Sequence, residues 1–330
     1  MAGILDTFTS MISSDLAGKA GRAIGVDSSL VTRGFSAIAP VVLGGLTKAS
    51  ATPSGAASIF KGLPQDTGGD WLSSITDLLG GDAARRQASQ TESIFGAGAN
   101  AIGATLSEKL GFNVRPLLSL AIPMVLGIVS KTVKSQNLNA QGLADQLRTE
   151  NDAFMKDPSN KETAGLVFSA LAASDKANAL RQMFDEGEWL KVRNGPLTAL
   201  YHVATASPSG PVGLTKEFSA AADAISEAAK AASATSLIGA AFGEGLAQDR
   251  LMQLAKERPE PKTLLAGLHE CVAIVASKSP ADAQSYRDVI LDAARRAAEA
   301  TKEGGFLGIG GTRVSETEQR ALDDIRSALT

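Results

Sequence analysis

Apolar and polar residues follow a helical spacing from the start of the chain. Within residues 1–24 the apolar positions, with Asp, Thr and Ser between them, are Ile4, Leu5, Phe8, Met11, Ile12 and Leu16. This spacing of three and four predicts one amphipathic helix over residues 1–24. Gly25 ends that helix, and Asp27 or Ser28, both common N-cap residues, begins an apolar helix that runs to Lys48.

One apolar segment of the chain occurs twice. The stretch AIAPVVLGGLTK, residues 37–48, returns as LAIPMVLGIVSK, residues 120–131, with a proline near the centre of each. The matching positions, in chain order, are Gly25 with Gly111, Pro40 with Pro123, Leu43 with Leu126, Gly44 with Gly127 and Lys48 with Lys131. So many matches in the same order indicate a tandem repeat.

The composition changes after about residue 160, from which point most segments are charged, alanine-rich helix patterns such as ADAQSYRDVILDAARRAAEATKE. Turn sequences such as SPSGP and RPEPK separate these segments, and no stretch shows the period-2 alternation of a strand. We therefore predict an all-α fold. Tandem small helical domains over residues 1–80 and 94–150 are followed by a helical bundle over residues 160–330.

The repeated segment leaves two interpretations open. Each copy has roughly 15 uncharged residues, about 22 Å of helix, whereas a membrane core is about 30 Å thick, so neither is a good membrane span. Both helices are either buried in their own domains or in contact with another copy, a partner protein or a membrane surface. The residues that such a contact would use are Pro40, Leu43, Gly44, Pro123, Leu126 and Gly127.

Composition and charge narrow the choice of partners. The chain is 44% hydrophobic but 5% aromatic and contains 33 glycines, so its apolar residues are small and favour close contact between helices. The net charge of −3 offers no excess of cations for phosphates, which excludes nucleic acid as an expected partner. We expect the chain to bind itself or another protein, with a membrane surface as the lesser alternative.

The single cysteine, Cys271, has no partner for an internal disulfide and is typical of a reducing compartment. The first residues, MAGILDTFTSMISSDLAG, contain Asp6 and Asp15 and lack the basic and long apolar regions of a signal peptide. Both observations favour the cytoplasm.

Residues 14–63 and 94–147 resemble the YidB-like bacterial proteins of unknown function. The resemblance rests on AIGVDSSLV followed by AIAPVVLGGLTK, and on KLGFNVRPLL followed by AIPMVLGIVSK, and it covers roughly the first 150 residues. It implies small helical domains in a cytoplasmic bacterial protein and no particular activity. Such domains are similar to homeodomain folds, but the helix in the position of the DNA-recognition helix carries almost no Lys or Arg.

The last 170 or so residues have a fainter resemblance to TerB-like helical domains of bacterial stress and tellurite-resistance systems. It lies in VATASPSGPVGLTKEFSAA and GTRVSETEQRALDDI, which match two acidic turns of that family by position. Ser209 and Gly210 stand where the family has Asp-Gly, so the first acidic pair is incomplete. The resemblance leaves Glu217 and Glu316 as candidate ligands of a cation.

No set of residues in the sequence forms a recognisable catalytic or metal site. His202 and His269 both fall in apolar helices, and successive residues of a helix point in different directions, so His269, Glu270 and Cys271 do not converge. Two histidines and one cysteine are a poor supply of zinc ligands. We predict no catalytic residues, no metal and no cofactor.

GGFLGIGGTR, residues 304–313, looks like a phosphate-binding loop but lacks both the preceding strand and the lysine of that motif. It leads into SETE, where Ser315 and Glu318 are predicted to form the capping box of the last helix. The doublets Arg85-Arg86 and Arg295-Arg296 are interpreted as solvated helix faces rather than binding patches, and the acidic FDEGEW segment as a charged helix end.

Two functions remain possible. The chain is a non-enzymatic interaction or scaffold protein that binds itself or a partner through apolar helices, or it is a stress-linked helical module that binds a metal ion or small ligand. An enzyme ranks below both, because the sequence presents no convergent acid–base set.

Overall fold

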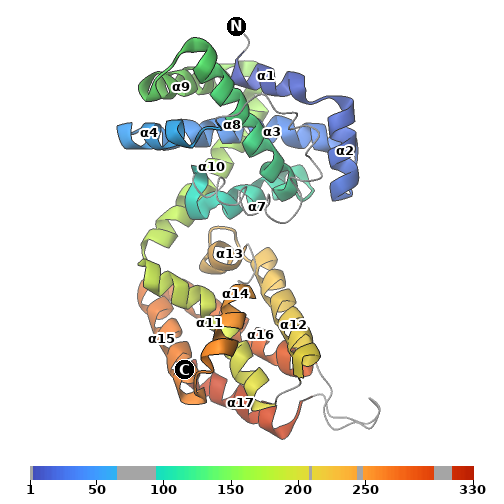
Figure 1. Cartoon of the computed structure of the whole chain (residues 1–330), viewed down its shortest axis with the longest axis vertical. Helices are drawn as coiled ribbons and strands as arrows, with labels where there is room; N and C mark the ends of the chain where they lie inside the picture. Colours follow the sequence, from blue (N-terminus) through green and yellow to red (C-terminus); the bar gives the residue numbers. More distant parts are fainter. Residues whose placement is uncertain (1–2, 65–93, 208–209, 244–247, 301–313) are drawn as a thin grey trace. The chain divides into compact units, whose positions relative to one another are not determined.

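The computed structural model describes residues 3–64, 94–207, 210–243, 248–300 and 314–330. All regular structure in these ranges is helical and none is strand, which confirms the predicted all-α fold. The chain divides into two compact units, residues 1–176 and 177–330, and the boundary lies inside helix α10, Lys161–Gln182 (Figure 1).

The first unit begins with two helices where the sequence predicts one. Helix α1, Ile4–Met11, ends before Ile12, and α2, Ser14–Ile24, begins after Ser13. The Ser13 hydroxyl accepts a hydrogen bond from the backbone N–H of Leu16 at 3.1 Å, so a local N-cap interrupts an unbroken apolar pattern. The predicted single helix over residues 1–24 is therefore wrong.

The repeat boundaries follow the sequence closely. Gly25 and Gly111 end α2 and α7, Ala99–Leu110, in the left-handed conformation, with φ of 73° and 80°. The Asp27 carboxylate caps α3, Ser28–Ala49, by accepting from the backbone N–H of Ser29 at 2.7 Å. Glycine tolerates a positive φ without steric cost, which explains why both copies break at this position.

The two copies pack against each other, equivalent helix on equivalent helix. The Pro-centred helices α3 and α8, Arg115–Gln136, lie together, and so do α4, Pro53–Gly62, and α9, Ala140–Lys156 (Figure 1). Contact is close at Gly34 of α3, where an added Cβ would lie 2.6 Å from Cδ1 of Leu117 in α8.

A single hydrophobic cluster forms the core of the first unit. Its fully buried members come from both copies and include Phe35, Ile38 and Leu43 of α3 and Leu117 and Ile122 of α8. The sequence predicts separate small domains over residues 1–80 and 94–150, with a bundle starting at 160. The structure instead joins both copies in one core, because each apolar helix covers the other.

The second unit is a helical bundle around α11, Glu186–Ala206. The helices around it are α12, Gly210–Ala231; α13, Leu237–Phe242; α14, Gln248–Glu257; α15, Pro261–Lys278; α16, Ala283–Glu299; and α17, Glu316–Ala328. Asp185 caps α11, and the predicted capping box of Ser315 and Glu318 begins α17, with both of its hydrogen bonds present.

A tyrosine of α16 supplies a hydrogen bond that a proline removes from the middle of α11. Pro196 has no N–H, so it cannot donate to the carbonyl of Val192 one turn earlier. The hydroxyl of the fully buried Tyr286 donates to that carbonyl instead, at 2.7 Å. Gly195 leaves room for this hydroxyl, because a Cβ there would collide with it.

We predict that Tyr286→Phe lowers the free energy of unfolding of the second unit by about 1–3 kcal/mol, because it leaves a buried carbonyl without a donor. In a Pro196→Ala background the same change should cost clearly less, since the N–H of residue 196 can then donate to Val192. Urea denaturation of the four proteins of this double-mutant cycle measures the difference. Equal losses in both backgrounds would contradict the proposed repair.

Candidate functional site

The candidate residues of the first copy lie inside the unit. Pro40, Leu43 and Gly44 of α3 are all buried. A Cβ at Gly44 would lie 2.9 Å from Cδ1 of Leu171 and 3.5 Å from Cγ1 of Val167, both on α10. This part of α3 is therefore a core element, as the first interpretation of the sequence expects.

The candidate residues of the second copy have different surroundings. Leu126 of α8 is buried, but Pro123 and Gly127 are half-buried. None of the described atoms lies within 4 Å of a Cβ placed on Gly127. Ser119, Pro123, Gly127 and Lys131, spaced four apart, lie along one side of the helix, which we call the α8 face.

The difference between the copies arises from α10. This helix follows α9 and packs Val167 and Leu171 onto Gly44 of the first copy. In the described part of the chain no second helix does the same at Gly127, so the environments of two matched positions differ. The repeat can be recognised in the sequence, but this asymmetry cannot. The pattern of apolar residues in α10 does not indicate which copy of the repeat the helix packs against.

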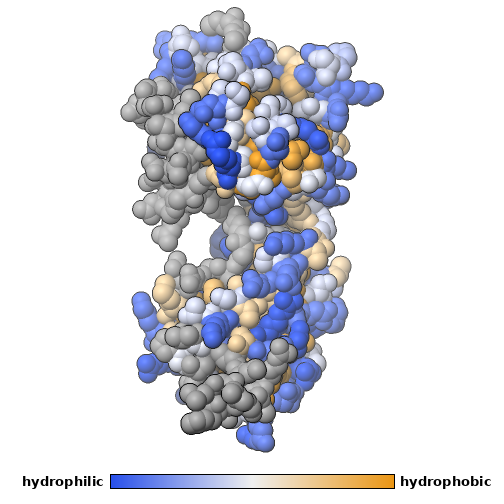
Figure 2. All heavy atoms as spheres, turned by 90° about the vertical axis from the view of Figure 1, so that its right-hand side faces the viewer, coloured by the Kyte–Doolittle hydropathy of each residue, from blue (hydrophilic) through white to orange (hydrophobic). Residues whose placement is uncertain are grey.

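The first unit also presents apolar residues to solvent. Figure 2 shows a group of hydrophobic residues on one face of this unit, with hydrophilic residues around it. Two of its helices, α3 and α8, are long and apolar enough to cross a membrane by length and composition. Most of each apolar window is buried, 72% in α3 and 67% in α8, and a buried core helix passes the same test.

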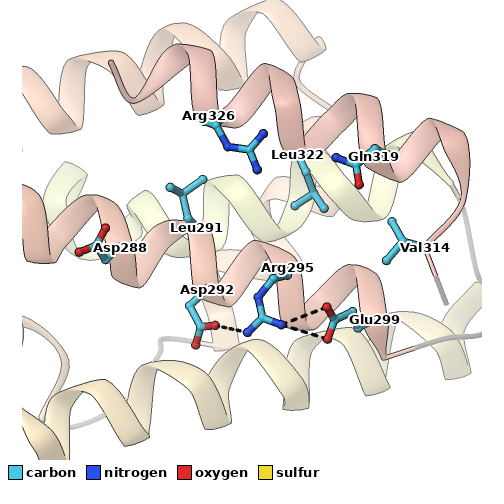
Figure 3. Close-up of a pocket in the computed structure, with 9 residues that line it drawn as sticks. All are labelled: Asp288, Leu291, Asp292, Arg295, Glu299, Val314, Gln319, Leu322 and Arg326. Carbon is cyan, nitrogen blue, oxygen red and sulfur yellow. Dashed lines mark hydrogen bonds and ion pairs between the residues drawn. The ribbon is translucent and has the colours of Figure 1, made fainter.

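The second unit contains a groove of about 350 Å³ between α16 and α17 (Figure 3). Its lining residues are Asp288, Leu291, Asp292, Arg295, Glu299, Val314, Gln319, Leu322 and Arg326. Leucine side chains from both helices lie between them, and the polar groups surround this apolar strip. The groove cannot be predicted from the sequence, since the spacing of its charged residues on α16 is also that of an ordinary charged helix face.

Ion pairs within the groove neutralise its arginine side chains. Arg295 Nη2 lies 2.6 Å from Asp292 Oδ1, and Arg295 Nη1 lies 3.0 Å from Glu299 Oε1. Arg326 Nη1 lies 2.6 Å from Oδ1 of Asp323. Because these cations already have carboxylate partners, the groove is better suited to apolar contact than to binding an anion.

The two candidate cation ligands lie in unlike environments. Glu217 on α12 is buried, whereas the side chain of Glu316, in the first turn of α17, is 92% exposed and lies 3.3 Å from Arg320 Nη2. No group of three or more His, Cys, Asp or Glu side chains able to hold a metal occurs among the described residues. Ser209, Arg85-Arg86 and residues 304–313 lie outside those residues.

The single thiol is buried and protonated. Cys271 donates to the carbonyl of Lys191 with an Sγ–O distance of 3.2 Å, and burial raises the pKa of its thiol to about 11. A cysteine nucleophile must form a thiolate, so this side chain is unsuited to that role at neutral pH.

His202 and His269, the two histidines, are placed differently. His269 is exposed, and its Nδ1 lies 3.3 Å from the carbonyl oxygen of Ala328. His202 is buried in α11, and neither of its ring nitrogens has a hydrogen-bond partner among the described residues. Burial lowers the pKa of His202, and the Asp324 carboxylate opposes that shift only in part.

Residues 6–132 match the model of a family described as bacterial protein of unknown function (DUF937), to which YidB belongs. The match covers more than a third of the chain and confirms the resemblance to YidB-like proteins. It spans both copies of the repeat, from α1 to most of α8, in agreement with their shared core. No curated protein and no solved structure matches the chain.

The TerB-like resemblance of residues 160–330 is not shown by these comparisons and stays a prediction. The same holds for the expected cytoplasmic location and for the absence of a catalytic role. The family description supplies no substrate, ligand or partner, so any function has to be argued from the residues themselves.

We predict that acid destabilises the second unit through His202. The pKa of His202 is lower in the folded protein than in the unfolded chain, where it is about 6.5. The free energy of unfolding is therefore at its full value above about pH 6.5 and falls as the pH drops from there through the folded-state pKa. The slope is at most about 1.4 kcal/mol per pH unit. His202→Leu should therefore melt with a weaker pH dependence than the wild type between about pH 7 and 5.

His269→Gln is the matched comparison, because it removes the exposed histidine and leaves the buried ring of His202 in place. Thermal melting followed by circular dichroism in buffers of equal ionic strength measures all three proteins. An identical pH profile for His202→Leu and wild type would contradict the role of the buried ring.

Proposed function

We propose that this protein is a non-enzymatic bacterial interaction protein that binds a helix of a protein partner on the α8 face. The observation that carries the proposal is the difference between the matched glycines of the repeat. A Cβ at Gly44 would touch a helix of its own chain, whereas a Cβ at the half-buried Gly127 would have none of the described atoms within 4 Å. Among the described residues, the same kind of surface is thus covered by α10 in the first copy and open at the added Cβ position in the second.

The packing at Gly44 indicates what would fit at Gly127. In the first copy, branched apolar side chains of a neighbouring helix lie against a glycine one turn after the central proline. A glycine removes side-chain bulk and lets a second helix come close. Gly127 also follows its proline by one turn, so we expect a helix with apolar side chains at the α8 face.

The backbone of α8 adds a polar feature to this surface. Pro123 cannot donate to the carbonyl of Ser119, which precedes it by one turn on the same face. A partner helix with a hydroxyl or amide side chain at that level would supply the missing donor. Apolar contact at Gly127 and a hydrogen bond near Ser119 together give the partner a defined direction along α8.

The proposal is tested by placing the same side chain at the two matched glycines. Gly44→Arg should unfold the first unit, because the new side chain would enter the contact with Leu171. Gly127→Arg should keep the circular-dichroism spectrum and the melting temperature close to wild type, since arginine favours helix over glycine by about 0.5–1 kcal/mol at a position with space.

The binding arm of the experiment compares wild type and Gly127→Arg by sedimentation and by co-purification with tagged protein. We expect association to be lost in Gly127→Arg while folding persists. The proposal fails if Gly127→Arg unfolds like Gly44→Arg, which would show that the α8 face is part of the core. It also fails if association is unchanged by the substitution.

A further inference from the structure

Four cationic side chains of the first unit lie near the two glycine turns of the repeat. They are Arg22, Arg33, Lys109 and Arg115. None of the four forms an ion pair with a carboxylate in the described part of the chain. Most arginines described in the second unit do have such a partner. The charge of these four side chains is therefore available to something outside the chain.

The packing of the two copies brings these cations together. α3 and α8 meet at Gly34, where an added Cβ would lie 2.6 Å from Cδ1 of Leu117. Arg33 directly precedes Gly34, and Arg115 lies two residues before Leu117, so each copy places one cation beside this contact. The side chain of Arg33 also reaches α7, since its Nη2 lies 3.3 Å from the carbonyl oxygen of Leu110.

The other two cations lie in the last turns of α2 and α7. Arg22 is three residues before Gly25, and Lys109 is two residues before Gly111. Lys109 also directly precedes the residue whose carbonyl Arg33 contacts. None of the described atoms lies within 4 Å of a Cβ added to Gly25 or Gly111, so both turns are open on that side.

Apolar side chains lie among the cations. Ile24, Val26 and Leu30 are half-buried around the first turn, and Phe112 is half-buried in the second. Leu30 and Arg33, three residues apart, share one side of α3. We call the four cations and these four apolar residues together the turn surface.

Two carboxylates also lie at the turn surface. Asp27 caps α3 by accepting from the backbone N–H of Ser29, and Glu108 is exposed in the last turn of α7. Asp15, earlier on α2, is paired with Lys19 at 2.8 Å. The four cations thus outnumber the carboxylates around them, although the chain as a whole has a net charge of −3. Positive charge is concentrated at this end of the first unit.

We propose that the turn surface binds the face of a membrane that contains anionic lipids. The four cations would meet lipid phosphates, and the half-buried apolar side chains would lie at the boundary between headgroups and acyl chains. Binding of this kind leaves α3 and α8 in the core, where most of each apolar window is buried. It is independent of the proposed function, because Gly127 lies ten residues after Leu117, about 15 Å along α8.

The layout of the charges favours a lipid surface over an acidic protein. One cation comes from each of four helices, α2, α3, α7 and α8, so the charges are spread over an area instead of following one helix. The glycine turns between these helices are open, whereas the groove described above lies in the second unit. A membrane presents many mobile phosphates and requires no matched spacing of partners.

The first test is co-sedimentation with vesicles of phosphatidylglycerol and phosphatidylcholine in equal parts. The wild type should bind them at low salt, bind far less at about 0.5 M salt, and stay off vesicles of phosphatidylcholine alone. Combining Arg22→Gln with Lys109→Gln should weaken binding by roughly fivefold for each cation removed. Both side chains are exposed, so the circular-dichroism spectrum should be that of the wild type.

The matched control combines Lys61→Gln with Lys156→Gln. It removes the same charge from exposed lysines of the same unit, on α4 and α9, away from the turn surface. We expect this control to bind the vesicles like the wild type.

The second test asks whether the apolar residues reach the acyl chains. Ala23→Trp places a fluorescent ring at the exposed end of α2, and Ala57→Trp places one at an exposed position of α4. Lipids brominated on their acyl chains should quench the fluorescence of Ala23→Trp more strongly than that of Ala57→Trp. The native tryptophans contribute equally to both variants.

The inference fails if the wild type stays off the anionic vesicles, or if Arg22→Gln with Lys109→Gln binds them as the wild type does. Equal quenching in the two tryptophan variants would also overturn it. So would binding to polyglutamate without binding to vesicles, which would indicate an acidic protein partner. Gly127→Arg should bind vesicles like the wild type, so the result for the turn surface and the result for the α8 face are read separately.

Discussion

The first unit depends on the mutual burial of two apolar helices. Both α3 and α8 are apolar over most of their length, and among the described residues neither is enclosed by the other helices of its own repeat alone. When α3 packs on α8, each helix buries the apolar surface of the other, and both become part of one core. Duplication of the segment is thus a condition of its burial.

The proposed interaction surface follows from α10, which packs on the central glycine of one copy of the repeat. α10 occurs once, so it can complete the cover of only one copy, and its inner side chains lie at Gly44. The second copy keeps the same sequence features at Pro123 and Gly127 with a different environment. The proposed function is therefore placed at Gly127, whose surroundings differ from those of the matched Gly44.

The sequence predicts the features that depend on neighbouring residues. Glycine breaks at 25 and 111, the Asp27 cap and the capping box of α17 all involve groups within a few residues of each other. It does not predict the pairing of α3 with α8, the exposure of Phe168 or the bond from Tyr286 to Val192, since each depends on residues far apart in the chain. The predicted break-free helix over residues 1–24 fails for a related reason, because the periodic pattern hides the cap at Ser13.

The pairing of α3 with α8 and of α4 with α9 resembles the like-with-like contact of a homodimer, enclosed here in one chain. Two separate polypeptides with this interface would dissociate on dilution, and their folded fraction would vary with their concentration. A covalent connection turns the association into an intramolecular step with a high effective concentration. The duplicated core therefore holds together at the lowest copy number at which the protein is made.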